Sequence, residues 1–249
     1  MRRISLLLLL VLPLSCGWAD YKDDLIAKYP FYKTAVGKFA PVYPALAQQF
    51  VQDYGITKGV CVDMGGGCGC LAMALAKVTK LKVYVLDIDP SAVRLCGILA
   101  DEAGLTGRVV PIEGDAQAMP FRDAYADLIV SRGSIFFWPD QVAGLKEAYR
   151  VLKPGGVAFI GGCFGRLLDA AAREELLKAR KQGSGGGGQG QGQKDSGSMT
   201  KMGWHAVDEA VVEKAKAAGI TQIRLIHETE DESWVEIKKP AGPGTAAGN

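Results

Sequence analysis

One carboxylate and a run of glycines are the residues of this chain best suited to hold a ligand. Asp63 ends a short apolar stretch, residues 60–62, and Gly65, Gly67 and Gly69 follow it at every second position. Glycine allows positive φ angles and brings backbone N–H groups close to a ligand. A helix that begins directly after the turn points the positive end of its dipole at the same place. This strand, turn and helix predict a site for a nucleotide-like ligand.

Further carboxylates follow the next two apolar stretches. Asp87 directly follows the apolar residues 81–86, and Asp115 comes shortly after the stretch 108–112. An acidic residue at the end of the second strand can accept hydrogen bonds from both ribose hydroxyls. Asp87 is the first candidate for that contact and Asp89 the second. Because Asp89 precedes Pro90, we expect it instead to cap the helix that follows.

The glycine spacing separates two classes of ligand. Dinucleotide sites carry Gly-x-Gly-x-x-Gly, whereas this chain has acidic-x-Gly-x-Gly-x-Gly from Asp63. The second pattern resembles motif I of the class I S-adenosylmethionine (SAM) dependent methyltransferases. Gly-Asp-Ala at 114–116, the stretch 126–140 and Leu-Lys-Pro-Gly-Gly at 152–156 resemble later motifs of that family, in the same order. Leu86 departs from the pattern, since the family usually has glycine there. The resemblance spans roughly residues 35–165 and continues more weakly to about 240.

The resemblance implies which residues meet the cofactor. Those assigned to it are Asp63, Gly65, Gly67, Gly69, Asp87, Ile88, Asp115, Ala116 and Ser131. Asp63 and the turn would hold the methionine part, Asp87 the ribose, and Asp115 with Ala116 the adenine. The loop 131–139 would face the transferred methyl group. The candidates to face the acceptor are Ser131, Arg132 and Trp138, and the aromatic side chains 136–138 would either wall an apolar acceptor or pack in the core.

The family resemblance also implies the fold. We expect a doubly wound, Rossmann-like α/β sheet of seven strands, mostly parallel with an antiparallel last strand, and helices on both faces. The periodicity adds a helix that carries Leu145 and Leu152 on one face and stops at Pro154. Helices are also expected at 167–181 and 200–218, and strands at 157–161, 223–226 and 234–237.

The chain is expected to form a single SAM-binding domain over residues 20–240. Its first part, 20–54, predicts a helical cap that Pro30 and Pro41 break into pieces. Residues 182–198 contain no apolar side chain and predict a flexible Gly/Gln-rich loop. Residues 241–249 predict a disordered tail.

The first 19 residues have the three parts of a secretory signal. Arg2 and Arg3 form a basic head, residues 4–14 are apolar, and small residues at 17 and 19 suit cleavage after Ala19. This pattern predicts an exported or membrane-associated protein. Lipidation at Cys16 is the alternative, and a protein that does not use the segment would be cytoplasmic.

Charge and cysteine content bear on whether the protein binds nucleic acid or metal. The formal net charge is +2 and no basic patch interleaves with aromatic residues, so nucleic acid is not an expected partner. Cys68 and Cys70 flank Gly69, where they are either small residues accepted by a tight turn or a redox-active or soft-metal pair. No spacing completes a metal site, and we expect none.

Methyl transfer from a sulfonium is an in-line displacement in which the protein mainly positions the reactants and shields them. The pattern most resembles the branch with quinone-biosynthesis and arsenite methyltransferases, which favours a small or lipophilic acceptor. Two alternatives remain open: a SAM-binding protein without catalysis, and a NAD-dependent oxidoreductase. The glycine spacing and Gly-Asp-Ala disfavour the second.

Overall fold

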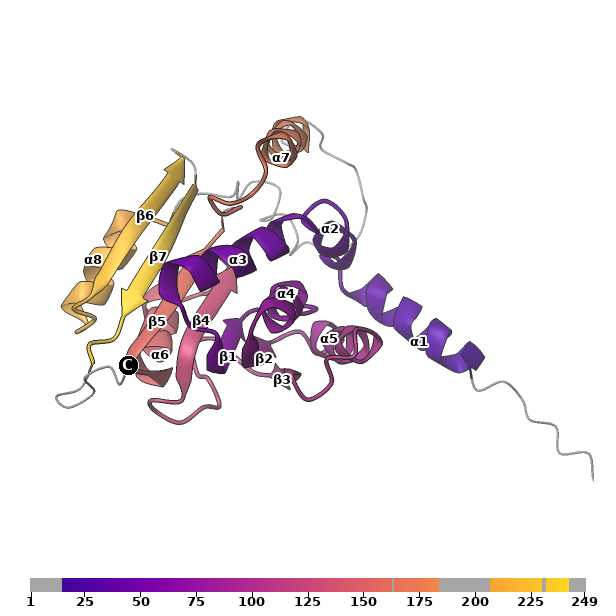
Figure 1. Ribbon diagram of the computed structural model, residues 1–249, viewed down its shortest axis with the longest axis horizontal. Helices are drawn as coiled ribbons and strands as arrows, with labels where there is room; N and C mark the ends of the chain where they lie inside the picture. Colours follow the sequence, from indigo (N-terminus) through magenta and orange to yellow (C-terminus); the bar gives the residue numbers. More distant parts are fainter. Residues whose placement is uncertain (1–14, 163, 184–206, 230–231, 242–249) are drawn as a thin grey trace, which may run out of the picture.

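The computed structural model describes residues 15–162, 164–183, 207–229 and 232–241. They form a seven-stranded sheet in the order β3-β2-β1-β4-β5-β7-β6, with helices around it (Figure 1). In chain order the elements are α1 (Ser15–Lys28), α2 (Tyr32–Val36), α3 (Val42–Tyr54), β1 (Lys58–Met64), α4 (Cys70–Val78), β2 (Lys80–Asp87), α5 (Pro90–Glu102), β3 (Val109–Glu113), β4 (Ala126–Arg132), η1 (Ile135–Phe137), α6 (Gln141–Val151), β5 (Leu152–Gly161), α7 (Ala170–Gly183), α8 (Glu209–Ala217), β6 (Ile223–Thr229) and β7 (Glu232–Lys238).

The strand directions confirm the expected doubly wound sheet. β1 to β5 pair in parallel, and β7 is antiparallel to both of its neighbours, β5 and β6. From β1 the chain proceeds outward to β2 and β3, and then returns to place β4 on the other side of β1. This reversal is a topological switch point, and ligands of open α/β sheets bind beside the carboxyl ends of the strands there.

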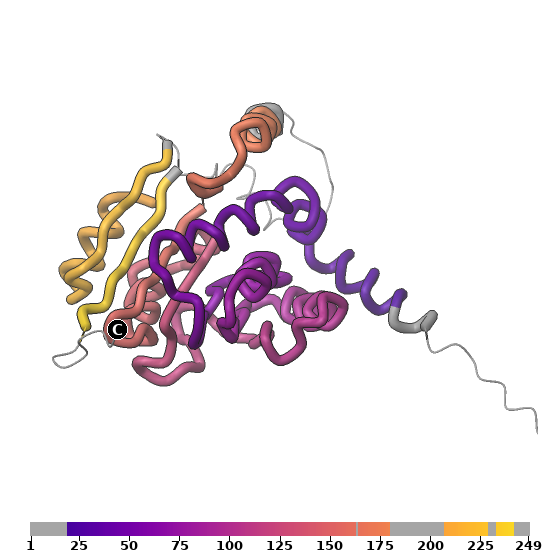
Figure 2. Tube along the Cα trace, viewed as in Figure 1, coloured from indigo at the N-terminus to yellow at the C-terminus, as the bar shows by residue number. Residues whose placement is uncertain are grey.

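Two apolar layers hold the sheet between helices. Side chains alternate along each strand, so that Cys61 packs beneath α3 and α4, while Val62 packs on the opposite face. The first layer includes residues of α3, α4, α5 and α7, and the second includes residues of α6 and α8. The tube of Figure 2 shows α3 crossing over the strands of the sheet.

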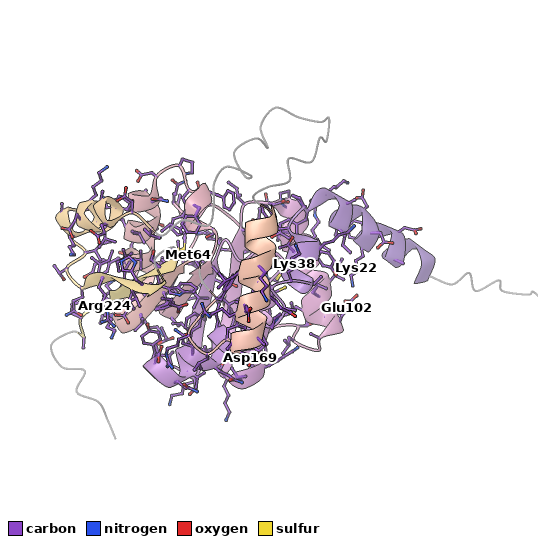
Figure 3. All side chains as sticks on the ribbon, turned by 90° about the horizontal axis from the view of Figure 1, so that it is seen from above. Lys22, Lys38, Met64, Glu102, Asp169 and Arg224 are labelled. Carbon is purple, nitrogen blue, oxygen red and sulfur yellow. The ribbon has the colours of Figure 1, made fainter. Side chains whose placement is uncertain are left out.

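The N-terminal helices follow the predicted breaks. α1 ends before Pro30 and α3 begins after Pro41. Leu25 anchors α1 through full burial, and an ion pair from Lys22 to Glu102 joins α1 to α5 at 2.6 Å (Figure 3). Because the glutamate is half exposed, the ion pair stabilises little, and the buried leucine is the stronger anchor.

Several expected boundaries were wrong. The helix expected at 200–218 begins at Glu209 within the described residues, because the carboxylate of Asp208 accepts a hydrogen bond from the N–H of Ala210 and caps it. Leu152 belongs to β5 rather than to the preceding helix, because it pairs with Ala126 of β4. The helix expected at 167–181 begins at Ala170, since the carboxylate of Asp169 accepts hydrogen bonds from the N–H groups of its first turn. The segments 1–14, 184–198, 200–206 and 242–249 of the expected signal, loop, helix and tail lie outside the described residues.

None of the helices within the described ranges is both long and apolar enough to cross a membrane.

Candidate functional site

A cavity of about 730 Å³ opens at the switch point of the sheet. Its floor is the turn after β1, and its walls come from the ends of β2, β3 and β4 and from the N-terminal helices. The side chains and backbone that line it belong to Tyr29, Pro30, Phe31, Thr34, Ala35, Phe39, Tyr43, Asp63, Gly65, Gly66, Gly67, Cys68, Cys70, Leu71, Asp87, Ile88, Asp89, Gly114, Asp115, Ala116, Gln117, Arg132, Gly133, Ser134, Phe136, Phe137, Trp138 and Pro139. Motifs from four separate loops therefore meet in one place.

The glycine turn is held by its own backbone and by its neighbours. Gly65 and Gly66 both donate their N–H groups to the carbonyl oxygen of Leu86, at 2.7 and 3.1 Å. Gly65 has φ +64°, and a Cβ atom there would overlap the Cβ of Ser134. Gly69 has φ +80° and packs against the sulfur of Cys96. The turn thus needs glycine both for its backbone angles and for close packing.

Asp63 is a buried carboxylate with an oxygen that no described residue satisfies. Its side chain is 1 % exposed, and Oδ2 has no hydrogen-bond donor among the described residues. Burial and the nearby charge of Asp87 raise the pKa of Asp63 from 3.8 to about 7, although the N–H of Ala72 opposes the shift. An unsatisfied buried carboxylate oxygen is destabilising, and a cationic ligand group would relieve it.

Asp87 and Asp89 have different structural roles at the end of β2. Asp87 accepts hydrogen bonds from the N–H of Gly67 at 2.7 Å and from that of Asp89 at 3.0 Å, so it holds the glycine turn directly. Burial raises the pKa of Asp87. Asp89 caps α5 through Ser91 and Ala92, as the sequence predicted.

Asp115 and Ala116 lie at the third strand end. Asp115 accepts hydrogen bonds from both the backbone and the side-chain amide of Gln117, the former at 2.8 Å. Ala116 is buried against the second apolar layer. Ile88, by contrast, lies 71 % exposed at the mouth of the cavity.

Ser131 and Arg132, neighbours at the end of β4, differ in whether they line the cavity. Arg132 enters the cavity, with its guanidinium 4.1 Å from the ring centre of Phe39 and 5.6 Å from that of Tyr43. Ser131 is fully buried and does not line the cavity; its hydroxyl lies 2.6 Å from that of Ser134, which donates to the carbonyl of Met64. Gly69 is likewise absent from the lining, because it packs on Cys96 instead.

An aromatic wall forms the outer half of the cavity. Phe136, Phe137 and Trp138 line it from one side, and Tyr29 and Phe31 from the other. The rings of Phe31 and Phe137 meet edge to face with centres 5.9 Å apart. Tyr29, Pro30 and Phe31 of the N-terminal cap therefore line the cavity together.

Several lining residues were not found from the sequence. Phe39 and Tyr43 sit in the helical cap without a distinctive spacing, and Gln117 follows the recognised Gly-Asp-Ala. Ser134 belongs to the loop 131–139, which the sequence did predict to face the site. Its place against Gly65 is evident only in the folded structure. No group of three or more metal-ligating side chains gathers within the part of the chain that the structure describes.

Comparison with known proteins agrees with this geometry. Residues 62–160 match the family model described as "Methyltransferase domain". A protein of Methanococcus maripaludis, provisionally described as a SAM-dependent methyltransferase, has a crystal structure that superposes with a TM-score of 0.70 at 29% identity, covering 90% of this chain and 95% of that one. This chain carries a class I SAM-dependent methyltransferase domain.

The curated relatives share parts of this methyltransferase domain. The chloroplastic 2-methyl-6-phytyl-1,4-hydroquinone methyltransferase of Arabidopsis thaliana is 44% identical over 102 residues, which are 41% of this chain and 29% of the relative. An uncharacterized Mycobacterium tuberculosis protein is 35% identical over 135 residues, 52% of this chain and 47% of the relative. This chain thus spans less than a third of the plant relative and about half of the mycobacterial one.

The same methyltransferase fold also serves other chemistry. The [4+2]-cyclase SpnF superposes with a TM-score of 0.50 at 20% identity, covering 80% of this chain and 82% of that one. A fold does not determine an activity, so the function has to be argued from the residues of the site.

Proposed function

We propose that this protein transfers a methyl group from SAM to a small or lipophilic acceptor by in-line displacement. The observation that carries the proposal is the charge of the cavity. Its described lining includes four carboxylates, those of Asp63, Asp87, Asp89 and Asp115, and a single basic side chain, Arg132. Such a cavity attracts a cation. SAM carries a sulfonium and an ammonium group, whereas the diphosphate of a nicotinamide cofactor would be repelled.

The residues fit the parts of the cofactor. The unsatisfied oxygen of Asp63 suits the ammonium of the methionine part. The glycine turn offers a bare backbone surface, and Asp87 lies beside it, where its carboxylate could accept hydrogen bonds from the ribose hydroxyls. Asp115 and Ala116 would meet the adenine. The bound cofactor supplies an activated methyl group with its own leaving group.

The aromatic wall supports an apolar acceptor. Phe136, Phe137 and Trp138 present ring surface toward the cavity, and Tyr29 and Tyr43 add a hydroxyl each. Burial raises the pKa of both tyrosines, which keeps them protonated at neutral pH, so they would donate hydrogen bonds rather than act as bases. These features agree with the proposed quinone-biosynthesis and arsenite methyltransferase branch at the level of a lipophilic acceptor.

Calorimetric titration tests the proposal. We expect SAM and its demethylated product to bind and NADH not to bind. Methyl transfer from labelled SAM to a panel of small aromatic and prenylated acceptors then separates an enzyme from a SAM-binding protein without catalysis. Binding of NADH alone would overturn the proposal, and SAM binding without turnover on any acceptor would favour the non-catalytic alternative.

Replacing Asp87 with alanine is expected to weaken SAM binding by about 1–3 kcal/mol, because charged hydrogen bonds to the ribose are lost. The matched control is Asp89→Ala, which removes the cap of α5 and costs about 1 kcal/mol of stability while leaving SAM affinity nearly unchanged. Titration calorimetry and urea unfolding measure the two effects. The opposite result, with only Asp89→Ala weakening binding, would move the ribose contact to Asp89.

We also propose that the first 19 residues direct export or membrane association. The basic head, the apolar run and the small residues near Ala19 support this. N-terminal sequencing of protein from its native source tests it, and an intact Met1 on material from the cytoplasm would contradict it.

A further inference from the structure

Two thiols lie together in the turn that forms the floor of the cavity. The sulfur atoms of Cys68 and Cys70 are 3.7 Å apart, and both residues line the cavity. Cys68 is 2 % exposed, whereas Cys70 is only partly buried. The two residues are separated by Gly69 alone, whose φ of +80° lets the chain fold back so that both side chains meet.

The two thiols are chemically unequal. Cys70 is the first residue of α4, where the helix dipole favours a thiolate. The contact between the two sulfur atoms lowers the pKa of Cys70, and the same contact together with burial raises the pKa of Cys68. Cys70 is thus the nucleophile and Cys68 the proton donor beside it.

Cys61 and Cys96 lack this setting. Cys61 is fully buried in β1, and burial raises its pKa well above the ordinary value. Cys96 is fully buried behind Gly69, and burial raises its pKa to about 12. Neither lines the cavity.

We propose that Cys68 and Cys70 form a reversible disulfide when the protein meets a hydroperoxide, and that this disulfide closes the SAM site. The closure of the SAM site rests on the proposed function; the disulfide does not. Because both thiols line the cavity and the disulfide is reversible, the modification acts as an oxidation-dependent control of cofactor binding.

The step balances with the hydroperoxide as oxidant. The Cys70 thiolate attacks the outer oxygen of hydrogen peroxide, the O–O bond breaks, and hydroxide leaves, which gives a sulfenic acid. The Cys68 sulfur then attacks the Cys70 sulfur, and the sulfenic oxygen leaves as water with the Cys68 proton. Peroxide is reduced by two electrons, and the two thiols are oxidised to one S–S bond.

Closure of this bond has to deform the turn. A disulfide holds its sulfurs about 2.0 Å apart, well below their present 3.7 Å. Gly69 cannot move freely, because a Cβ at its position would lie only 2.6 Å from the Cys96 sulfur. The adjustment therefore falls on the other side of Cys68, where the Gly67 N–H is bonded to Asp87. Thiol–disulfide exchange with a dithiol reductant reverses the change.

Mass mapping of the full chain after hydrogen peroxide treatment tests the disulfide. Trypsin releases residues 59–77, which contain Cys61, Cys68 and Cys70, and residues 95–108, which contain Cys96. We expect the first peptide to lose two hydrogen atoms while Cys61 remains open to alkylation after denaturation. A cross-link between the two peptides, or no loss of hydrogen, would overturn the proposal.

Calorimetry on the same samples tests the control of binding. We expect the oxidised protein to bind SAM at least about tenfold more weakly, with affinity restored by dithiothreitol. Cys70→Ser should bind SAM equally before and after peroxide, whereas Cys61→Ala, a substitution in the buried strand β1 away from the cavity lining, should retain the peroxide effect. Unchanged affinity in a fully disulfide-bonded sample refutes the control. If the reduced protein fails to bind SAM, the proposed function fails and the control with it, while the mass map still decides whether the disulfide forms.

Discussion

Asp63→Asn is expected to remove measurable SAM binding while making the ligand-free protein more stable at pH 8. The wild-type carboxylate is fully buried, and one of its oxygens has no donor among the described residues. Asparagine keeps the size of the side chain and removes the charge. The substitution therefore relieves the cost of a buried anion and at the same time removes the group that holds the ammonium of the cofactor.

The pH dependence follows from the direction of the shift. The pKa of Asp63 is about 7 in the folded protein and near 3.8 in the unfolded chain, so the folded state holds the proton more tightly. The contribution of Asp63 to the free energy of unfolding is therefore fully present below pH 4, where the carboxyl is protonated. It is lost as the pH rises to about 7. Asp63→Asn has no titrating group here, so its free energy of unfolding does not fall with pH. The difference in its favour over the wild type grows across the same pH range to at most about 4 kcal/mol. Urea unfolding at pH 4, 6 and 8 measures it.

Cofactor binding should show the complementary trend. Because the free protein must lose the Asp63 proton to hold an ammonium, wild-type SAM affinity is expected to fall about tenfold per pH unit below pH 7. Asp23→Asn is the matched control, since Asp23 is exposed on α1 and the same chemical change there should alter neither stability nor binding. An Asp63→Asn protein that binds SAM normally would show that the ammonium lies elsewhere.

Gly65→Ala is expected to destabilise the protein by about 2–5 kcal/mol and to abolish SAM binding. A left-handed alanine costs about 1–2 kcal/mol, and Gly65 has φ +64°. The new Cβ also overlaps the Cβ of Ser134, an atom fixed to the backbone, which adds an overpacking cost of about 1–3 kcal/mol. Chemical unfolding and calorimetry report the two losses.

Gly55→Ala separates the two causes. Gly55 has the same φ of +64° at the end of α3, but a Cβ there would meet nothing within 4 Å. We expect a loss of about 1 kcal/mol and unchanged SAM affinity. Equal losses for the two variants would mean that the contact between Gly65 and Ser134 does not constrain the turn.

The order of strands, turns and helices was predictable from the sequence because those signals are local. Alternating apolar stretches ending in acidic residues located β1, β2 and β3, and the Pro30 and Pro41 breaks divided the cap. The Asp89 cap was also predictable, since it depends only on residues two and three positions ahead. The wrong boundary at Leu152 shows the limit of local signals. Leu152 belongs to β5 because it pairs with Ala126 of β4, a residue far away in the sequence.

The membership of the cavity was decided by the tertiary structure. Ser131 and Ser134 are equally polar and three residues apart, yet only Ser134 lines the cavity, because Ser131 lies on the buried side of β4. Phe39 and Tyr43 reach Arg132 only because α3 and the loop before it cross the end of β4. Chemistry carried by neighbours in the chain could be read from their types and spacing. Contacts between elements far apart in the chain could not, since packing of the two apolar layers sets how those elements meet.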